Sequence, residues 1–145
     1  VSNLPGEIAK RELAVVKERL SLADDDLHIR SYPSPGPGNA VIIRLAFENV
    51  REIFVGFGEI GVTAERVAER LCDTVKRFLK SEAAVNHHLA DQLLLPMALG
   101  VGGAFTMQRP SLHFETNCAV IEKFLDVDID CSQQCEGRWR TVVSR

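Results

Sequence analysis

The sequence has no apolar run long enough to cross a bilayer, because its longest one, residues 93–101, is interrupted by Pro96. It also has no excess of positive charge: 17 Lys and Arg stand against 20 Asp and Glu, a formal net charge of −3 at pH 7. That balance excludes a broadly basic protein that coats nucleic acid. It leaves room for a local phosphate site, which needs only a few cations and backbone amides. The first twenty residues are charged and helix-like, so no signal peptide is predicted.

The sequence has few cysteines, and their spacing does not match a metal-binding motif. The four cysteines are Cys72, Cys118, Cys131 and Cys135, and none forms a CxxC pair. The C-x3-C at 131–135 has no histidine or second cysteine pair near it at zinc-ligand spacing. We therefore expect no metal or redox site built on these residues, and a reduced, intracellular setting.

The amino-acid composition of the chain is that of a globular protein. Hydrophobic residues make up 46% of the 145 positions and charged residues 26%. This length suits one ordinary domain or two small lobes. Because the chain begins with Val rather than Met, we expect a fragment or a processed product.

Hydrophobic periodicity predicts an α+β first lobe. Thr63 is expected to cap its second helix. The predicted elements are a helix at 5–20, a short strand at 27–34, a Pro/Gly turn at 34–39, an antiparallel hairpin of runs 40–50 and 51–59, and a helix at 64–80.

A second unit is predicted from about residue 84. Its second helix is expected to turn Val120, Ile121, Phe124 and Leu125 inward. Its predicted elements are a mostly apolar, buried helix closed by Gly100, a strand at 102–108, a helix at 116–125, and strands at 127–131 and 139–145.

The first helix of this unit carries a polar cluster. His88, Asp91 and Gln92 lie at i, i+3 and i+4, so they project from one face. Polar groups on a buried helix must find partners. Two explanations stay open: a ligand site, or a structural role in which Asp91 and Gln92 bind loop backbone.

His113 stands between a strand and a helix, in the segment RPSLHFETN. Histidine serves as nucleophile, base or ligand. Thr116 and Asn117 are candidates to cap the next helix, whose amides would face an anion. By itself the pattern suits either a phosphate site or a structural turn. Trp139, between Arg138 and Arg140, is expected to face the core rather than stack on RNA.

Two stretches carry a family resemblance: AAVNHHLADQLLLPMAL at 83–99 and PSLHFETNCAVIEKFL at 110–125. Together they resemble the RNA 3′-terminal phosphate cyclases, and a looser likeness extends over the rest of the chain. The resemblance implies an enzyme that uses ATP to convert an RNA 3′-phosphate into a 2′,3′-cyclic phosphate. It implies His113 as the catalytic nucleophile that becomes adenylated, with His88, Asp91 and Gln92 at the ATP/AMP site. A divalent metal, Mg or Mn, is implied as a cofactor, with ligands mostly outside this chain.

The resemblance also implies a domain layout. Residues 1–83 would be most of a thioredoxin-like α+β insert, and 84–145 the last β-sheet/two-helix repeat of the catalytic domain. The N-terminal part of the same protein would be missing, so the chain alone is expected to hold only part of the ATP pocket. RNA with a 3′-phosphate end is the expected partner, with no membrane, in the cytoplasm, or the nucleus of a eukaryote. The alternative is a non-catalytic cyclase-like scaffold in ribosomal RNA processing. A redox module is disfavoured because CxxC is absent.

Overall fold

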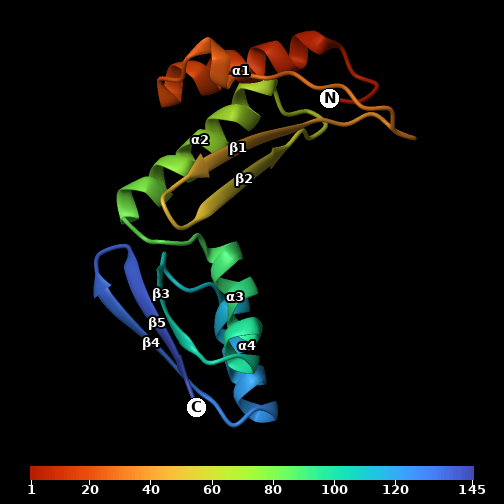
Figure 1. Ribbon diagram of the computed structural model, residues 1–145. Coiled ribbons are helices and arrows are strands. Elements are labelled where there is room, and N and C mark those ends of the chain that lie inside the picture. The colour runs from red at the N-terminus through yellow and green to blue at the C-terminus, as the bar shows by residue number, and fades with distance from the viewer. The chain divides into compact units, whose positions relative to one another are not determined.

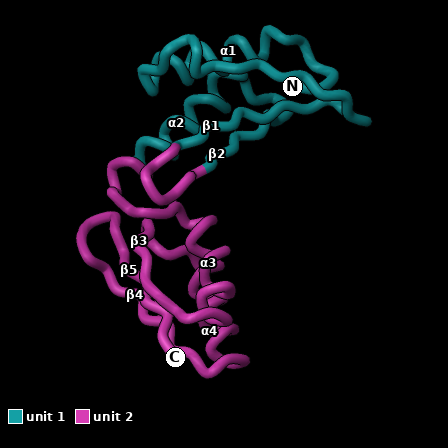
Figure 2. Tube along the Cα trace, in the orientation of Figure 1, with its two compact units in different colours: residues 1–45, 53–77 teal, residues 46–52, 78–145 magenta.

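A computed structural model describes residues 1–145 as a mixed α and β protein (Figure 1). The expected α+β class is confirmed at that level. The chain divides into two compact units (Figure 2). Unit 1 comprises residues 1–45 and 53–77, and unit 2 comprises residues 46–52 and 78–145. The expected boundary between an insert domain at residues 1–83 and a catalytic repeat at residues 84–145 stays a prediction.

Unit 1 contains the first helices and a hairpin. Alternation along the hairpin buries Val41, Ile43 and Phe54, while a Cβ added to Gly56 would meet Leu71 at 3.4 Å, so the second strand lies against the second long helix. Thr63 Oγ1 accepts the Arg66 N–H at 3.2 Å, which confirms the predicted cap. The elements are α1 (Gly6–Leu20), a 3-10 turn (Asp24–Asp26), β1 (Ala40–Ala46), β2 (Arg51–Phe57), antiparallel to β1, and α2 (Ala64–Ser81), which runs on into unit 2.

The strand predicted at 27–34 is wrong. These residues form no strand and are held by backbone bonds to the start of the chain. The Val1 ammonium donates to the Arg30 carbonyl at 2.9 Å, and the Tyr32 N–H donates to the Val1 carbonyl at 3.2 Å. The segment finds no ladder partner, and the prolines that follow cannot donate to one.

Unit 2 is a three-stranded antiparallel sheet with two helices packed on it. Its strands run in the order β3-β5-β4, so the last strand is central. In Figure 1 both helices lie along the same side of this sheet. The elements are α3 (His87–Leu99), β3 (Gly103–Met107), α4 (Leu112–Phe124), β4 (Asp128–Cys135) and β5 (Arg138–Ser144). The buried core consists of Val85, Ala90, Leu94, Ala98, Met107, Phe114, Ile121 and Val143, with Trp139 packed at its edge as predicted.

Helix α4 begins earlier than the sequence predicted. Ser111 is its N-cap, and its Oγ accepts the Phe114 N–H at 3.1 Å. Thr116 and Asn117 therefore lie inside the helix, and the cap assigned to them is wrong. The reason is that Ser111 supplies a capping hydroxyl directly after Pro110, where the chain is still extended. His113 consequently sits in the first turn of α4.

The inward face predicted for α4 was partly wrong. Ile121 is buried and Leu125 packs against the core, but Val120 and Phe124 are 46% and 82% exposed. A helix that packs on one layer buries only one stripe, and here Phe114 and Ile121 define it.

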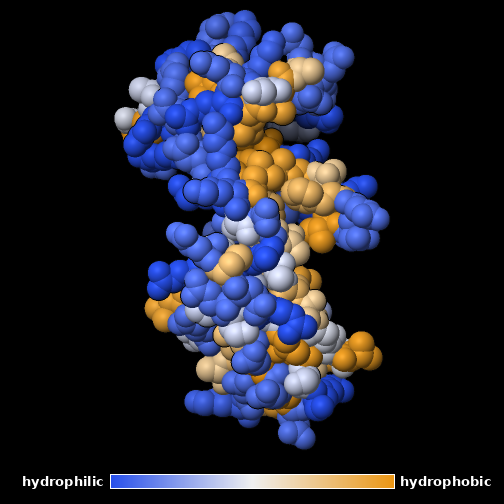
Figure 3. All heavy atoms as spheres, turned by 90° about the vertical axis from the view of Figure 1, so that its left-hand side faces the viewer, coloured by the Kyte–Doolittle hydropathy of each residue, from blue (hydrophilic) through white to orange (hydrophobic).

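Hydrophobic side chains also reach the surface elsewhere. Figure 3 shows orange residues between the hydrophilic ones on the face it presents. On the hairpin the exposed positions are Ile42, Ile53, Val55 and Phe57, and on the helices of unit 2 they include Leu95, Leu99 and Leu112. None of the helices has the length and apolar character of a membrane span.

Candidate active site

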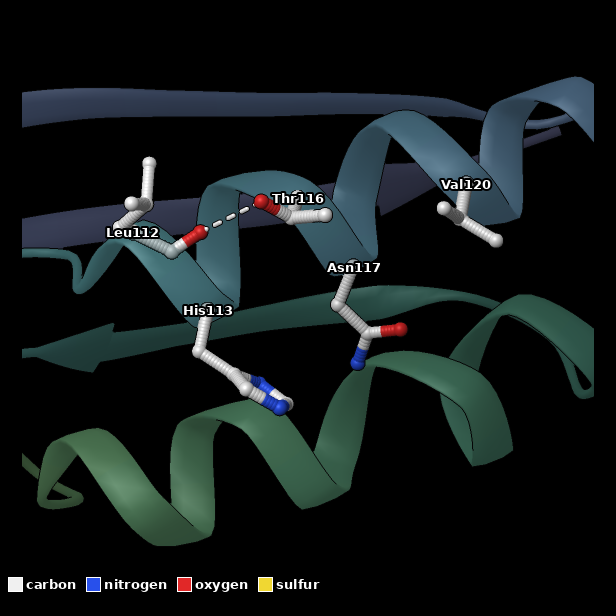
Figure 4. Close-up of a pocket in the computed structure, with 5 residues that line it drawn as sticks. All are labelled: Leu112, His113, Thr116, Asn117 and Val120. Carbon is white, nitrogen blue, oxygen red and sulfur yellow. Dashed lines mark hydrogen bonds between the residues drawn. The ribbon is translucent and has the colours of Figure 1, made fainter.

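Asp91, His113 and Asn117 form a polar cluster between α3 and α4. Asp91 Oδ2 lies 3.1 Å from His113 Nδ1, and Asp91 Oδ1 accepts the Asn117 Nδ2 amide at 3.0 Å. In Figure 4 the side chains of His113 and Asn117 both extend from α4 toward α3. The two carboxylate oxygens of Asp91 thus have one partner each on the neighbouring helix.

Local structure explains why these side chains meet. Residues 113 and 117 are four apart on α4, so they project from the same face. The first turn of α3 is fixed by Asn86, whose side-chain oxygen accepts the N–H groups of His88 and Leu89 at 2.8 and 2.9 Å. Both helices are capped close to the cluster, which limits fraying there.

The side chains of the cluster differ in their exposure to solvent. The Asp91 side chain is 22% exposed, whereas that of His113 is 80% exposed. With Nδ1 facing the carboxylate, Nε2 is the ring nitrogen that remains for another partner. A histidine oriented by a carboxylate through one nitrogen is a recurrent arrangement for a nucleophile, base or ligand that acts through the other.

His88 and Gln92 do not join this cluster. Both are exposed on α3, and the His88 ring lies 4.1 Å, centre to centre, from that of His87. Partial burial and the neighbouring His88 lower the pKa of His87. The prediction that α3 is buried was wrong. Only Ala90, Leu94 and Ala98 are buried on it, because the sheet and α4 cover one side.

A hollow of about 530 Å³ adjoins the exposed side of His113. It is lined by Leu112, His113, Thr116, Asn117 and Val120, all from α4 (Figure 4). The sequence interpretation missed Asn117 as a partner of Asp91, because it treated that residue as a cap. The i, i+4 spacing from His113 was the signal that could have found it.

The residues of the chain do not form a metal site. The chain contains no group of three or more His, Cys, Asp or Glu side chains placed to hold an ion. The carboxylate of Asp91 is already shared between His113 and Asn117. These residues therefore do not fit a resident divalent ion.

The model of the family described as RNA 3′-terminal phosphate cyclase matches residues 12–131. The chain belongs to this family. It is 44% identical over 137 residues to a protein of Ectopseudomonas mendocina named RNA 3′-terminal phosphate cyclase, covering 94% of this chain and 40% of that protein. Proteins of the same name from Ralstonia nicotianae and Salmonella enteritidis are 46% and 41% identical over 129 and 134 residues. The matches cover 89% and 92% of this chain, and 37% and 39% of those proteins. The chain thus spans about two fifths of the length of these relatives.

Proposed function

We propose that this chain is the nucleophile-bearing part of an ATP-dependent enzyme that converts an RNA 3′-phosphate into a 2′,3′-cyclic phosphate. Two observations support the proposal. The chain belongs to the cyclase family, and its single carboxylate-bound histidine is His113. The contact between Asp91 and His113 supports the proposed mechanism, because it distinguishes the two ring nitrogens of His113.

In the first step His113 attacks ATP. In this proposal the proton is on Nδ1, which lies 3.1 Å from Asp91 Oδ2, so the lone pair is on Nε2. That lone pair forms the N–P bond at the α-phosphorus, the bond from this phosphorus to the bridging oxygen breaks, and pyrophosphate leaves. The ring becomes positively charged as the bond forms, and the Asp91 carboxylate stabilises that charge.

Two transfers complete the reaction. An oxygen of the RNA 3′-phosphate attacks the phosphorus of the histidine-bound AMP, which gives an RNA–adenylate anhydride and returns the neutral imidazole. The 2′-hydroxyl then attacks the RNA phosphorus, loses its proton, and expels AMP as the ring closes. A phosphoramidate is labile enough to pass AMP onward, which is why a histidine suits this route.

The remaining site residues serve the nucleotide in this proposal. His88, Asp91 and Gln92 lie on successive turns of α3, with His88 and Gln92 exposed to solvent. We assign His88, Asp91 and Gln92 to the ATP/AMP site, where Asp91 in addition orients His113. Residues 1–83 are assigned to the thioredoxin-like insert and residues 84–145 to the last catalytic repeat, with a divalent ion bound elsewhere in the protein.

The test is covalent labelling of the full-length protein with ATP carrying a radioactive α-phosphate, in the presence of Mg²⁺. The proposal expects label that is lost in acid, survives alkali and disappears in His113→Ala. His28→Ala is the matched control, because His28 lies outside the cluster, and it should label normally. Labelling of His113→Ala at the wild-type level would overturn the assignment. A folded wild-type protein that takes no label would favour the scaffold alternative.

A further inference from the structure

Glu52, on β2, is a buried acidic residue that the proposed reaction does not use. It is 1% exposed, and it belongs with the hairpin tip (residues 46–52) to unit 2. Burial raises the pKa of its carboxyl group, and hydrogen bonds with Asn86 and the charge of His88 offset part of that rise. Burying an ionised carboxyl group costs free energy unless its partners compensate, so the contacts of Glu52 need an explanation.

The contact of Glu52 is with the start of α3. Its Oε1 accepts the backbone N–H of Asn86 at 2.9 Å, and Asn86 is itself 3% exposed. The Asn86 side chain in turn accepts the N–H groups of His88 and Leu89, and its carbonyl accepts the first helical bond from Ala90 at 2.9 Å. Glu52 therefore holds the residue that caps α3.

Asp91 lies five residues after Asn86, at the beginning of the second turn of the same helix. Its 3.1 Å contact with His113 depends on where this turn starts and how it is oriented. A displacement of about 1 Å at such a contact lowers reaction rates markedly. The chain of contacts thus runs from Glu52 through Asn86 to Asp91 and then to His113.

We propose that Glu52 is a positioning residue for histidine adenylation, which acts through Asn86 to fix the first turn of α3 and so holds Asp91 beside His113. The inference rests on the proposed function, and it adds a residue from the hairpin to the machinery of that reaction.

The test measures single-turnover formation of the protein–AMP adduct in the full-length protein at saturating ATP. Glu52→Ala should slow adduct formation by about tenfold or more, as loss of a supporting hydrogen bond commonly does, with the KM for ATP little changed. Glu52→Gln keeps an acceptor oxygen for the Asn86 N–H, so it should retain the rate within about threefold. Glu48→Gln, in the exposed turn of the same hairpin, should leave the rate unchanged.

A double-mutant cycle separates positioning from general stability. In an Asp91→Ala background, Glu52→Ala should slow labelling by less than about twofold further, because there is no carboxylate left to position. An equal loss in both backgrounds would overturn the inference while leaving the proposed function intact. Absence of label in the wild-type protein would overturn both.

A second variant covers the case in which Glu52→Ala does not fold. Asn86→Ala removes the capping oxygen but keeps the N–H that binds Glu52. It should slow labelling and show the same dependence on Asp91. A rate for Asn86→Ala equal to that of the wild type would overturn the inference.

Discussion

Asp91 Oδ2 lies 3.1 Å from His113 Nδ1, so one carboxylate on α3 faces one ring nitrogen of a histidine on α4 and leaves Nε2 for another partner. Asp91→Asn preserves the size of the side chain but removes the negative charge that, in the proposed reaction, would stabilise an adenylated ring. We expect it to lower the rate of adduct formation by about 10-fold or more, since loss of the partner behind a metal-bound histidine costs about 10- to 100-fold and loss of the carboxylate behind a catalytic histidine costs more. Single-turnover labelling at saturating ATP measures this.

The control for that experiment is Asp126→Asn, an exposed carboxylate just after α4. Asp126→Asn changes the net charge of the protein by the same amount, but it lies outside the cluster of Asp91, His113 and Asn117. It should therefore label at the wild-type rate. Equal rates for wild type and Asp91→Asn would mean that the contact has no part in the chemistry.

Ser111 offers a test of how the helix that carries His113 begins. Ser111→Ala removes the oxygen that accepts the Phe114 N–H at 3.1 Å. The free energy of unfolding should fall by about 1 kcal/mol, as for other helix caps. Ser111→Asp keeps an acceptor and adds a charge that suits the helix N-terminus, so it should recover most of the loss. Urea unfolding of the three proteins decides; an unchanged stability of Ser111→Ala would contradict the assigned cap.

The helix starts show what the sequence could and could not predict. Thr63 was correctly placed as a cap because a long amphipathic stripe follows it directly. For α4 the same reasoning chose Thr116 and Asn117, although Ser111 offered a hydroxyl earlier. Several capping residues stood within one short segment, and local preference alone does not rank them. Packing agrees with the earlier start, since Phe114, in the first turn of the helix, is buried in the core of unit 2.

The candidate site was predicted in its parts but not in its connections. His113 and Asp91 were named from sequence, because family resemblance marked both segments. Their mutual contact, and the share of Asp91 taken by Asn117, depend on how two helices cross, which periodicity does not encode. Glu52 was missed for the same reason: its partner Asn86 is far along the chain.

Glu12, on α1, predicts a pH dependence of stability. It is 2% exposed, and burial raises the pKa of its carboxyl group, while a hydrogen bond from Asn39 lowers it in part. The folded state therefore binds this proton more tightly than the unfolded chain. Its contribution to stability is fully present below the ordinary pKa of 4.5 and is lost as pH rises through the higher folded value.

Glu12→Gln has no such proton to lose and can still accept the Asn39 amide. Its free energy of unfolding relative to wild type should therefore rise as the pH is raised from 4 to 7. Urea unfolding at several pH values measures the difference. Glu7→Gln, on the exposed side of α1, is the control and should not show this divergence. Parallel curves for wild type and Glu12→Gln would contradict the argument.

Gly102, just before β3, is required by its backbone. Its φ is +72°, and a Cβ there would lie 2.3 Å from the carbonyl oxygen of Val143 on the central strand. Gly102→Ala combines an unfavourable φ with a clash against backbone, which cannot rotate away as a side chain can. The free energy of unfolding should fall by about 2 kcal/mol or more. Trp139, the chain's one tryptophan, packs against the core of unit 2, so its fluorescence during urea unfolding reports the change.

Gly6→Ala is the matched control for Gly102→Ala, since nothing lies within 4 Å of the added carbon and φ there is not positive. That variant should be as stable as wild type or slightly more stable, because alanine favours the helix. If Gly102→Ala unfolded at the same urea concentration as Gly6→Ala, the close approach of this loop to β5 would have to be abandoned.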